Sequence, residues 1–335
     1  MKKNIYLVTG CAGFIGFHVA KKILKSKKNI VVGIDNFTEY YSKNLKLDRL
    51  TILKKNKNFK FHNIDLSNKK KLELVFKKYK FLSILHIAAQ AGVLYSYKNP
   101  LSYYKNNIIA TKNIVDFIKK YQKLKKFIFC SSSSVYGDQE RFPITENFFL
   151  KPKNYYALTK KKSEEYIKKN LLKNKCTDNF LIFRLFTVYG PFGRPDMFIL
   201  KNLYNIYNRK VIKLYNSGNH YRDFTYIDDV VNIFLIFLNK KIYVKNNIIN
   251  LSGSRTIKII RLVKLFQKFL KIKLEYILET KRRGEVFKTY GSNKKLIKYF
   301  DYKKFTSIEQ GLKKTIKWFI KYPNKNNLNI NIKGI

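Results

Sequence analysis

Short apolar runs alternate with lysine-rich amphipathic stretches along the first half of the chain. Runs of strand length occur at Asn4–Thr9, Ile30–Asp35, Lys60–Asn63, Ser83–Ile87 and Lys126–Ser131. Helical spacing occurs at Ile15–Lys25, Lys69–Lys80 and Leu101–Tyr121, followed by a helix near Tyr156–Asn170 and a strand at Phe180–Thr187. This alternation is typical of repeated strand–helix units, so it predicts an α/β fold built on a doubly wound parallel sheet.

The regular pattern ends after Tyr189, where Gly190, Pro191, Gly193 and Pro195 mark a long loop. A helix at Thr225–Asn239 and a strand at Lys245–Ser252 are expected to return to the sheet, whereas Glu275–Tyr290 and the last helix belong to a separate lobe. We therefore predict a Rossmann-like domain over residues 1–188 with a returning segment at about 225–255. A smaller C-terminal lobe takes 189–224 and 256–322, and residues 323–335 are expected to form a disordered tail.

Composition favours a globular cytoplasmic protein. The hydrophobic content is 45%, and the longest apolar run, Ile233–Leu238, is far shorter than a membrane span. Cys11, Cys130 and Cys176 are odd in number and widely separated, and they have no histidines at metal-ligand spacing. We expect reduced cysteines, no metal site and no membrane-spanning segment.

The formal net charge of +49 raises the possibility of a nucleic-acid partner, because clustered basic side chains neutralise phosphates. Of the 70 basic residues, however, 60 are lysines spread along the whole chain, together with abundant asparagine, isoleucine, tyrosine and phenylalanine. This composition is typical of a codon bias towards A and T. We expect no specific nucleic-acid partner, only weak adhesion to polyanions at low salt.

A glycine-rich turn follows the first predicted strand and opens the first predicted helix. Gly10, Gly13 and Gly16 would let a pyrophosphate approach the amino end of that helix. Asp35 ends the next strand, where a carboxylate accepts hydrogen bonds from the adenosine ribose and favours NAD over NADP. Asp65 ends the third strand and has two interpretations, a helix cap or an adenine contact.

A tyrosine and a lysine lie four residues apart in Tyr156-Ala-Leu-Thr-Lys160, so they share one face of a helix. A free tyrosine has a pKa near ~10, and lowering it to neutrality requires roughly 4 kcal/mol of preferential phenolate stabilisation. Lys160 and an oxidised nicotinamide could provide this together, which would make Tyr156 a usable base. In isolation the pair would be a chance occurrence, but it follows the glycine turn and a serine run in a fixed order.

The serine run Ser131–Ser134 ends the fifth strand, at the edge of the sheet where open α/β folds bind ligands. Ser132 could hydrogen-bond a reacting hydroxyl, although such serines can also satisfy backbone groups in a turn. Cys11 and Cys130 flank this region without a neighbouring base, so we interpret both as small packing residues.

With these motifs the chain resembles the extended short-chain dehydrogenases, and among them the UDP-glucuronate 4-epimerases, to about Tyr322. The resemblance rests on five further segments: Gly33-Ile-Asp-Asn-Phe followed by Tyr40-Tyr41; Ala88-Ala-Gln-Ala-Gly92-Val; Ser131-Ser-Ser-Ser-Val-Tyr-Gly137; Phe186-Thr-Val-Tyr-Gly-Pro-Phe-Gly-Arg-Pro-Asp-Met197; and Arg222-Asp-Phe-Thr-Tyr-Ile-Asp-Asp229.

This resemblance implies roles for individual residues. The implied catalytic set is Ser132, Tyr156 and Lys160. The implied NAD contacts are Gly10, Gly13, Phe14, Ile15, Gly16, Asp35, Asn36, Asp65, Leu66, Ala88, Ala89, Asn106, Tyr156 and Lys160. Ser133, Ser134, Thr187 and Arg194 resemble the residues that hold the uronate carboxylate, for which a bidentate guanidinium is suited. Arg222, Arg282 and Glu285 resemble a clamp for uridine diphosphate, with surface ion pairs as the alternative.

The resemblance implies an NAD-dependent isomerase that inverts carbon 4 of UDP-glucuronate to give UDP-galacturonate through a transient 4-keto sugar, and it implies a homodimer. Two positions depart from the family pattern. Leu94 stands where arginine is usual, and Glu285 stands where aspartate is usual. The first leaves open a 4-epimerase of UDP-glucose or UDP-N-acetylglucosamine, or a UDP-glucuronate decarboxylase. Outside these enzymes, an NAD-binding sensor and a basic nucleic-acid binder remain alternatives.

Overall fold

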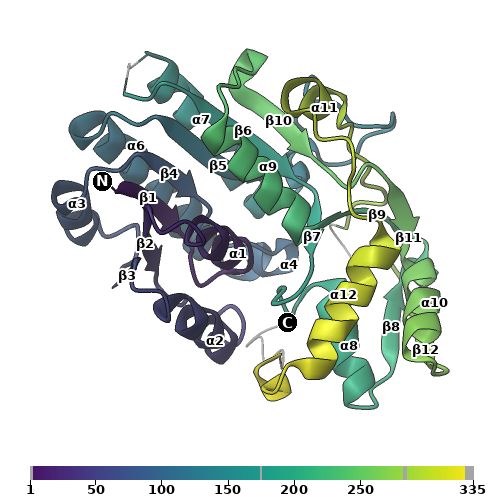
Figure 1. Ribbon diagram of the computed structural model, residues 1–335. Helices are drawn as coiled ribbons and strands as arrows, with labels where there is room; N and C mark the ends of the chain where they lie inside the picture. Colours follow the sequence, from purple (N-terminus) through teal and green to yellow (C-terminus); the bar gives the residue numbers. More distant parts are fainter. Residues whose placement is uncertain (1–2, 174–175, 282–284, 329–335) are drawn as a thin grey trace.

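A seven-stranded parallel sheet forms the centre of the protein (Figure 1). The computed structural model describes residues 3–173, 176–281 and 285–328. The strands are β1 (Asn4–Thr9), β2 (Asn29–Asp35), β3 (Phe59–Asn63), β4 (Ser83–His86), β5 (Lys126–Ser132), β6 (Phe180–Leu185) and β10 (Ile248–Leu251), in the order β10-β6-β5-β4-β1-β2-β3. The predicted doubly wound sheet is therefore confirmed, and the strand expected to return joins it beside β6.

Helices cover both faces of this sheet because successive strand residues point to opposite sides. On β1, Tyr6 and Val8 belong to one buried cluster and Leu7 to the other. The first cluster includes α1 (Phe14–Ile23), α2 (Lys43–Lys54) and α9 (Ile227–Asn239), and the second includes α3 (Lys69–Lys78), α6 (Ala110–Tyr121) and α7 (Tyr155–Lys173). The result is three layers, helix–sheet–helix, as Figure 1 shows.

The predicted helix at Leu101–Tyr121 is interrupted by a π-helical turn. A short helix α4 (Val93–Lys98) precedes α5 (Pro100–Tyr103), the π-helix η1 (Tyr104–Ile109) and α6. A π-turn shifts the phase of the helix, so neighbouring residues can face inwards. Asn106 here lines a cavity and Asn107 is buried.

The smaller lobe contains two short sheets. One pairs β8 (Ile212–Tyr215) with β12 (Tyr276–Glu279), and the other has the order β11 (Thr256–Lys258), β9 (Tyr221–Tyr226), β7 (Thr187–Tyr189). The lobe also contains α8 (Phe198–Tyr207), α10 (Ile259–Leu270) and α12 (Ile308–Lys321). In contrast, α11 (Lys294–Phe300) packs on β10 and α9 of the large sheet, where Phe300 contacts Phe183 and Phe237. Short helical turns occur at η2 (Ser133–Tyr136), η3 (Asn216–Gly218), η4 (Lys245–Asn247) and η5 (Lys325–Leu328). The strand predicted at Phe180–Thr187 is thus divided between β6 and β7, which belong to different sheets.

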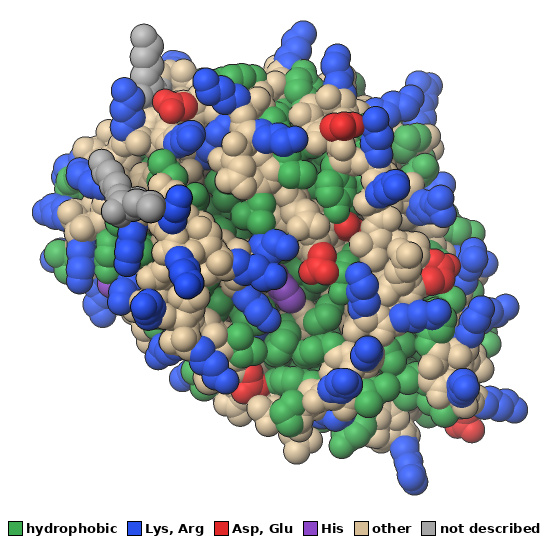
Figure 2. All heavy atoms as spheres, viewed as in Figure 1, with side chains coloured by type: hydrophobic (Ala, Val, Ile, Leu, Met, Phe, Trp, Pro, Cys, Tyr) green, Lys and Arg blue, Asp and Glu red, His purple; other side chains and the backbone are tan. Residues whose placement is uncertain are grey.

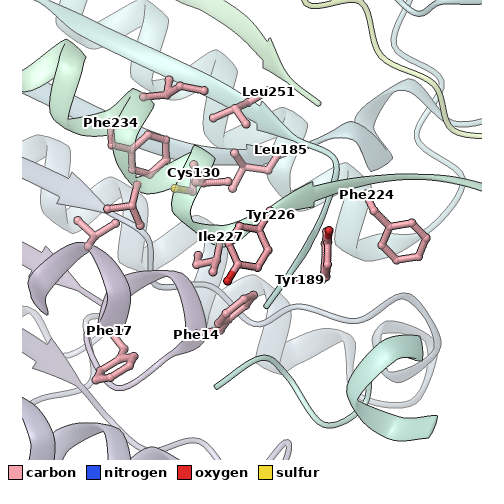
Figure 3. Close-up of a cluster of buried hydrophobic side chains, with 14 of the residues drawn as sticks. Phe14, Phe17, Cys130, Leu185, Tyr189, Phe224, Tyr226, Ile227, Phe234 and Leu251 are labelled. Atoms are coloured by element: carbon pink, nitrogen blue, oxygen red, sulfur yellow. The ribbon is translucent and has the colours of Figure 1, made fainter. Parts of the chain in front are cut away.

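One apolar core joins the sheet to the lobe (Figure 3). Leu185 and Leu251 come from neighbouring strands of the large sheet, and Phe234 from α9 packs beneath them. Tyr189 and Phe224 continue the cluster into the small sheet, with ring centroids 5.8 Å apart. Buried side chains from the large sheet and from the small sheet thus belong to one continuous cluster.

The chain after Tyr322 does not begin a disordered tail as expected. Leu328 is fully buried, and the side-chain amide of Asn327 donates to Asp48 on α2 at 2.7 Å. The Tyr322 hydroxyl donates to the same carboxylate. Residues 323–328 are therefore folded against α2, a helix that the sequence pattern did not predict; residues 329–335 lie outside the described part of the chain.

Basic side chains are scattered over the face of the molecule drawn in Figure 2 and do not gather into a single patch there. Within the described ranges, no helix is long and apolar enough to cross a membrane. The three cysteines are buried and unpaired.

Candidate active site

A cavity of about 790 Å³ lies where the carboxyl ends of the central strands face the lobe. Most residues singled out in the sequence line it, although they come from segments far apart in the chain. They are Gly10, Gly13, Phe14, Ile15, Gly16, Asp35, Asn36, Leu66, Ala88, Ala89, Asn106, Ser132, Ser133, Ser134, Tyr156, Lys160, Thr187, Arg194, Arg222 and Glu285. Arg282 lies outside the described residues, and Asp65 is not part of the lining.

The glycine turn leaves room at one end of the cavity. Gly10 has φ +69°, and a Cβ added there would lie 2.8 Å from the Ala88 Cα. A Cβ on Gly16 would lie 2.1 Å from the Gly10 carbonyl oxygen. The turn therefore requires glycine at both positions, and it presents the start of α1 to the cavity, where exposed backbone N–H groups bind anions.

Asp35 ties this turn to β2. Its carboxylate accepts hydrogen bonds from the backbone N–H groups of Ala12 and Phe37, each at 3.0 Å. Beside it, the Asn36 amide lies 3.5 Å from the side-chain oxygen of Asn106 on the π-turn. The carboxylate and these two amides border a glycine cradle, which fits the ribose and pyrophosphate of a dinucleotide.

Asp65 does not cap α3, and its contact with adenine stays a prediction. Its carboxylate accepts from the Ser67 backbone N–H at 2.8 Å, which closes a local turn. The cap of α3 is instead Asn68, whose side chain accepts from the Lys71 N–H at 3.1 Å. The neighbouring Leu66 supplies the cavity wall.

Tyr156 and Lys160 project from the first turns of α7 towards the end of β5. Burial raises the pKa of Tyr156, while a hydrogen bond with Ser132 and the positive charge of Arg194 lower it. Burial lowers the pKa of Lys160 to about 8, opposed by Cys130 and Glu164. The expected stabilisation of the phenolate by Lys160 together with an oxidised nicotinamide stays a prediction.

All four serines line the cavity, and two of them differ in their hydrogen-bond partners. Ser132 and Ser134 face the cavity, and the Ser134 hydroxyl lies 2.9 Å from the Ser132 hydroxyl. Ser131 instead donates to Glu164, which forms a buried ion pair with Arg184 at 2.7 Å. Ser131 therefore fastens the strand end to α7, so that Ser132 faces Tyr156.

Arg194 already has a carboxylate partner. Its Nε and one terminal nitrogen donate to Asp196 at 3.0 and 2.5 Å, and the Tyr40 hydroxyl donates to the same carboxylate at 3.0 Å. A guanidinium has two bidentate edges, and Arg194, which lines the cavity, uses one of them for Asp196. The sequence motif around Arg194 does not reveal that Asp196 and Tyr40 orient the guanidinium, because Tyr40 lies about 150 residues away in the chain.

At the opposite end, Arg222 and Glu285 line the cavity. Arg222 donates to the carbonyl oxygens of Tyr221 and Phe287 at 2.9 and 3.2 Å. Burial lowers its pKa, and the charge of Glu285 opposes that shift. The Glu285 carboxylate also lies 3.4 Å from His220 Nδ1.

The sequence did not indicate several other residues that line the cavity. They lie on α8, on α2 or in the segment before α2, and the sequence pattern predicted neither helix. They include Thr38, Tyr41, Lys46, Lys201, Tyr204 and Asn205. Lys46 donates to the Thr38 carbonyl and hydroxyl oxygens at 2.5 and 3.1 Å. The Tyr40-Tyr41 pair in the sequence could have indicated this part of the site, because buried tyrosine hydroxyls need hydrogen-bond partners.

The fold and this cavity define a class, the dinucleotide-binding α/β enzymes with a tyrosine–lysine pair at the edge of the sheet. The profile of the NAD dependent epimerase/dehydratase family matches residues 6–252. The chain belongs to this family of NAD-dependent enzymes.

Individual relatives agree with this assignment. The UDP-glucuronate 4-epimerase of Thermodesulfobacterium geofontis is 38% identical over 319 residues, which cover 93% of this chain and 95% of the relative. A crystal structure of the Bacillus cereus UDP-glucuronic acid 4-epimerase with UDP-glucuronic acid and NAD has a TM-score of 0.87 at 30% identity. The match covers 95% of this chain and 99% of the Bacillus cereus chain. A UDP-N-acetylglucosamine 4-epimerase from Methanobrevibacter ruminantium has a TM-score of 0.84 at 28% identity. This match covers 96% of this chain and 99% of the other.

Proposed function

We propose that this protein is an NAD-dependent 4-epimerase that converts UDP-glucuronate to UDP-galacturonate. The observation that carries the proposal is the placement of Tyr156, hydrogen-bonded to Ser132, in the middle of one cavity. The glycine cradle lies at one end of this cavity, and Arg194 and Arg222 lie on the lobe side. In this proposal residues 1–188 with the returning segment hold NAD, and the lobe holds the UDP-sugar.

The glycine cradle and Asp35 suit NAD, because the turn has no room for side chains and the carboxylate would repel a 2′-phosphate. Phe14, Ile15 and Leu66 would contact the dinucleotide through apolar surface, and Asn36 and Asn106 through amides. NAD, when bound, supplies the hydride acceptor and donor that let carbon 4 pass through a transient 4-keto state.

Tyr156 is the proposed base. Its phenolate would take the proton of the sugar 4-hydroxyl, while Ser132 holds that hydroxyl in line. The nearby positive charges of Lys160 and Arg194 would stabilise the phenolate that is required for this transfer. After the sugar ring has turned over, return of hydride to the opposite face of carbon 4, with return of the proton from Tyr156 to the oxygen, would leave carbon 4 with inverted configuration.

The carboxylate of the sugar requires control, because a 4-keto uronate is a β-keto acid that can lose carbon dioxide. Thr187 and Arg194, with Ser133 and Ser134, would hold the carboxylate so that its bond to the ring is poorly aligned with the carbonyl. Arg222, Glu285 and Arg282 are the proposed clamp for uridine diphosphate.

Product analysis tests this function directly. Purified protein incubated with UDP-glucuronate should give a mixture with UDP-galacturonate without net formation of NADH. Tyr156→Phe should lower kcat by about 10²- to 10⁴-fold and leave NAD bound, because only the proton-transferring hydroxyl is removed. A Tyr156→Phe protein with wild-type turnover would refute the assigned role of the phenol.

Leu94 favours a second candidate, a 4-epimerase of a neutral UDP-hexose. It lines the cavity where related enzymes usually carry arginine, so the chain has one cation fewer for an acidic sugar. Parallel incubations with UDP-glucose and UDP-N-acetylglucosamine distinguish the two candidates, and a UDP-pentose product would indicate decarboxylation. We also propose a cytoplasmic homodimer formed through α6 and α7, which light scattering in solution would test.

A further inference from the structure

Arg49 on α2 is a fully buried cation whose partners are carbonyls and a phenol. One terminal nitrogen donates to the carbonyl oxygen of Ala12 at 2.9 Å and to the Tyr41 hydroxyl at 2.8 Å. The other donates to the carbonyl oxygens of Phe192 and Gly193 at 2.7 and 2.9 Å. The described residues contain no ion pair to Arg49, whereas the buried Arg184 is paired with a carboxylate.

These contacts bring two binding loops to one side chain. Ala12 lies inside the glycine turn, between Gly10 and Gly13. Gly193 lies in the loop 190–197, and the next residue is Arg194. The loops are about 180 residues apart in sequence, so a side chain from a third segment holds both of them.

The geometry requires arginine specifically. Burying a cation without an ionic partner is unfavourable, so its polar contacts must compensate for the lost hydration. A guanidinium spreads its donors over a rigid plane and can serve carbonyls on two sides, whereas a lysine ammonium directs all donors from one point. In a chain with 60 lysines among 70 basic residues, position 49 is nevertheless arginine.

We propose that Arg49 is a positioning residue that couples the dinucleotide loop to the sugar-binding loop. By fixing the Ala12 carbonyl it holds the glycine turn in shape, and by fixing Phe192 and Gly193 it sets the position of Arg194 opposite the sugar. Arg49 does not contact either ligand. The proposal deepens the proposed function, because it rests on the ligand roles assigned above to these two loops.

Substitution of Arg49 should affect two ligands at once. Arg49→Lys keeps the charge but cannot reach both loops, so we expect the dissociation constants of NAD and of UDP-glucuronate each to rise about tenfold, the size expected for the loss of one charge-assisted hydrogen bond. With saturating ligands, kcat should stay within about twofold of wild type, because the reacting groups are intact. Calorimetry with NAD, and with UDP-glucuronate on the NAD-loaded protein, measures the two constants.

Leu53→Ala is the matched control. Leu53 lies on the same helix and is buried in the apolar core. Its truncation should therefore lower the melting temperature but leave the hydrogen bonds from Arg49 to the two loops in place. Both dissociation constants should then remain within about twofold of wild type. The proposal is overturned if Arg49→Lys binds both ligands as wild type does, or if Leu53→Ala weakens both to the same extent.

Tyr41→Phe keeps the proposal testable if Arg49→Lys does not fold. It removes one of the four Arg49 contacts, so both constants should rise together by about threefold; an effect on one ligand only would contradict the coupling. A wild-type protein that neither binds nor converts UDP-glucuronate would overturn the proposed function instead. In that case, the NAD affinities of the three variants still test whether Arg49 shapes the glycine turn.

Discussion

Asp223 on β9 is a buried carboxyl that fastens three segments of the lobe together. Its two oxygens accept from the backbone N–H groups of Gly253 at 2.6 Å and of Gly291 at 3.0 Å. Its own N–H donates to the Thr289 hydroxyl at 3.1 Å. Because Arg222 precedes Asp223 and Thr289 lines the cavity, this fastening holds the end of the cavity for which we propose uridine diphosphate binding.

Burial raises the pKa of Asp223 to about 7, opposed by the hydrogen bonds from Gly291, Gly253 and Ser252. The folded protein therefore binds a proton more tightly than the unfolded chain does, so its stability must fall as pH rises through the folded pKa. A rise from the ordinary value of 3.8 to about 7 corresponds to about 4 kcal/mol in total. About 2 to 3 kcal/mol of this loss falls between about pH 5 and about pH 8.

Asp223→Asn removes the titration, so the difference in unfolding free energy between variant and wild type should move in favour of the variant as pH rises. Urea unfolding at several pH values measures this difference. The variant also loses one carboxylate oxygen as a hydrogen-bond acceptor, which changes its unfolding free energy by an amount that is nearly independent of pH. Asp301→Asn, at an exposed position, is the control for the removal of a negative charge. A difference that stays constant from about pH 5 to about pH 8 would refute the reasoning, because it would mean that Asp223 has no perturbed protonation in the folded state.

Other predictions concern the active site and its support. Burial lowers the pKa of Lys160 to about 8, so its ammonium is lost above that pH and kcat should decline there; a pH–rate profile that stays flat well above pH 8 would count against a role for the charge. Glu164→Gln leaves Arg184 unpaired in the interior and should cost about 3–5 kcal/mol in urea unfolding, whereas the combined change Glu164→Leu with Arg184→Met should cost less, since no buried charge remains. Arg194→Lys loses the bidentate edge and should raise KM for UDP-glucuronate by about tenfold or more; an equal rise for UDP-glucose would contradict recognition of the carboxylate.

The hydrophobic pattern of the sequence predicted the repeated strand–helix units of the large sheet. The strands at β1, β2, β4 and β5 agree with their predicted bounds to within one residue. These strands are apolar runs bounded by turns, so local pattern and tertiary role agree. By contrast, α2 has apolar and charged residues mixed around its axis, and two of its basic residues are buried. No local pattern predicts that Lys46 and Arg49 face inwards, because their partners lie in other segments.

The amino-acid sequence by itself determined the doubly wound sheet, the glycine turn with Asp35, and the order of Ser132, Tyr156 and Lys160, since each is encoded in short-range spacing. The tertiary structure decided which side chains share the site. It paired Arg194 with Asp196 and Tyr40, joined Ser131 to Glu164, placed Asn68 rather than Asp65 at the cap of α3 and folded residues 323–328 onto α2. These outcomes depend on contacts between residues far apart in the chain, and the free energy of such contacts comes from burial and hydrogen bonding that exist only after folding.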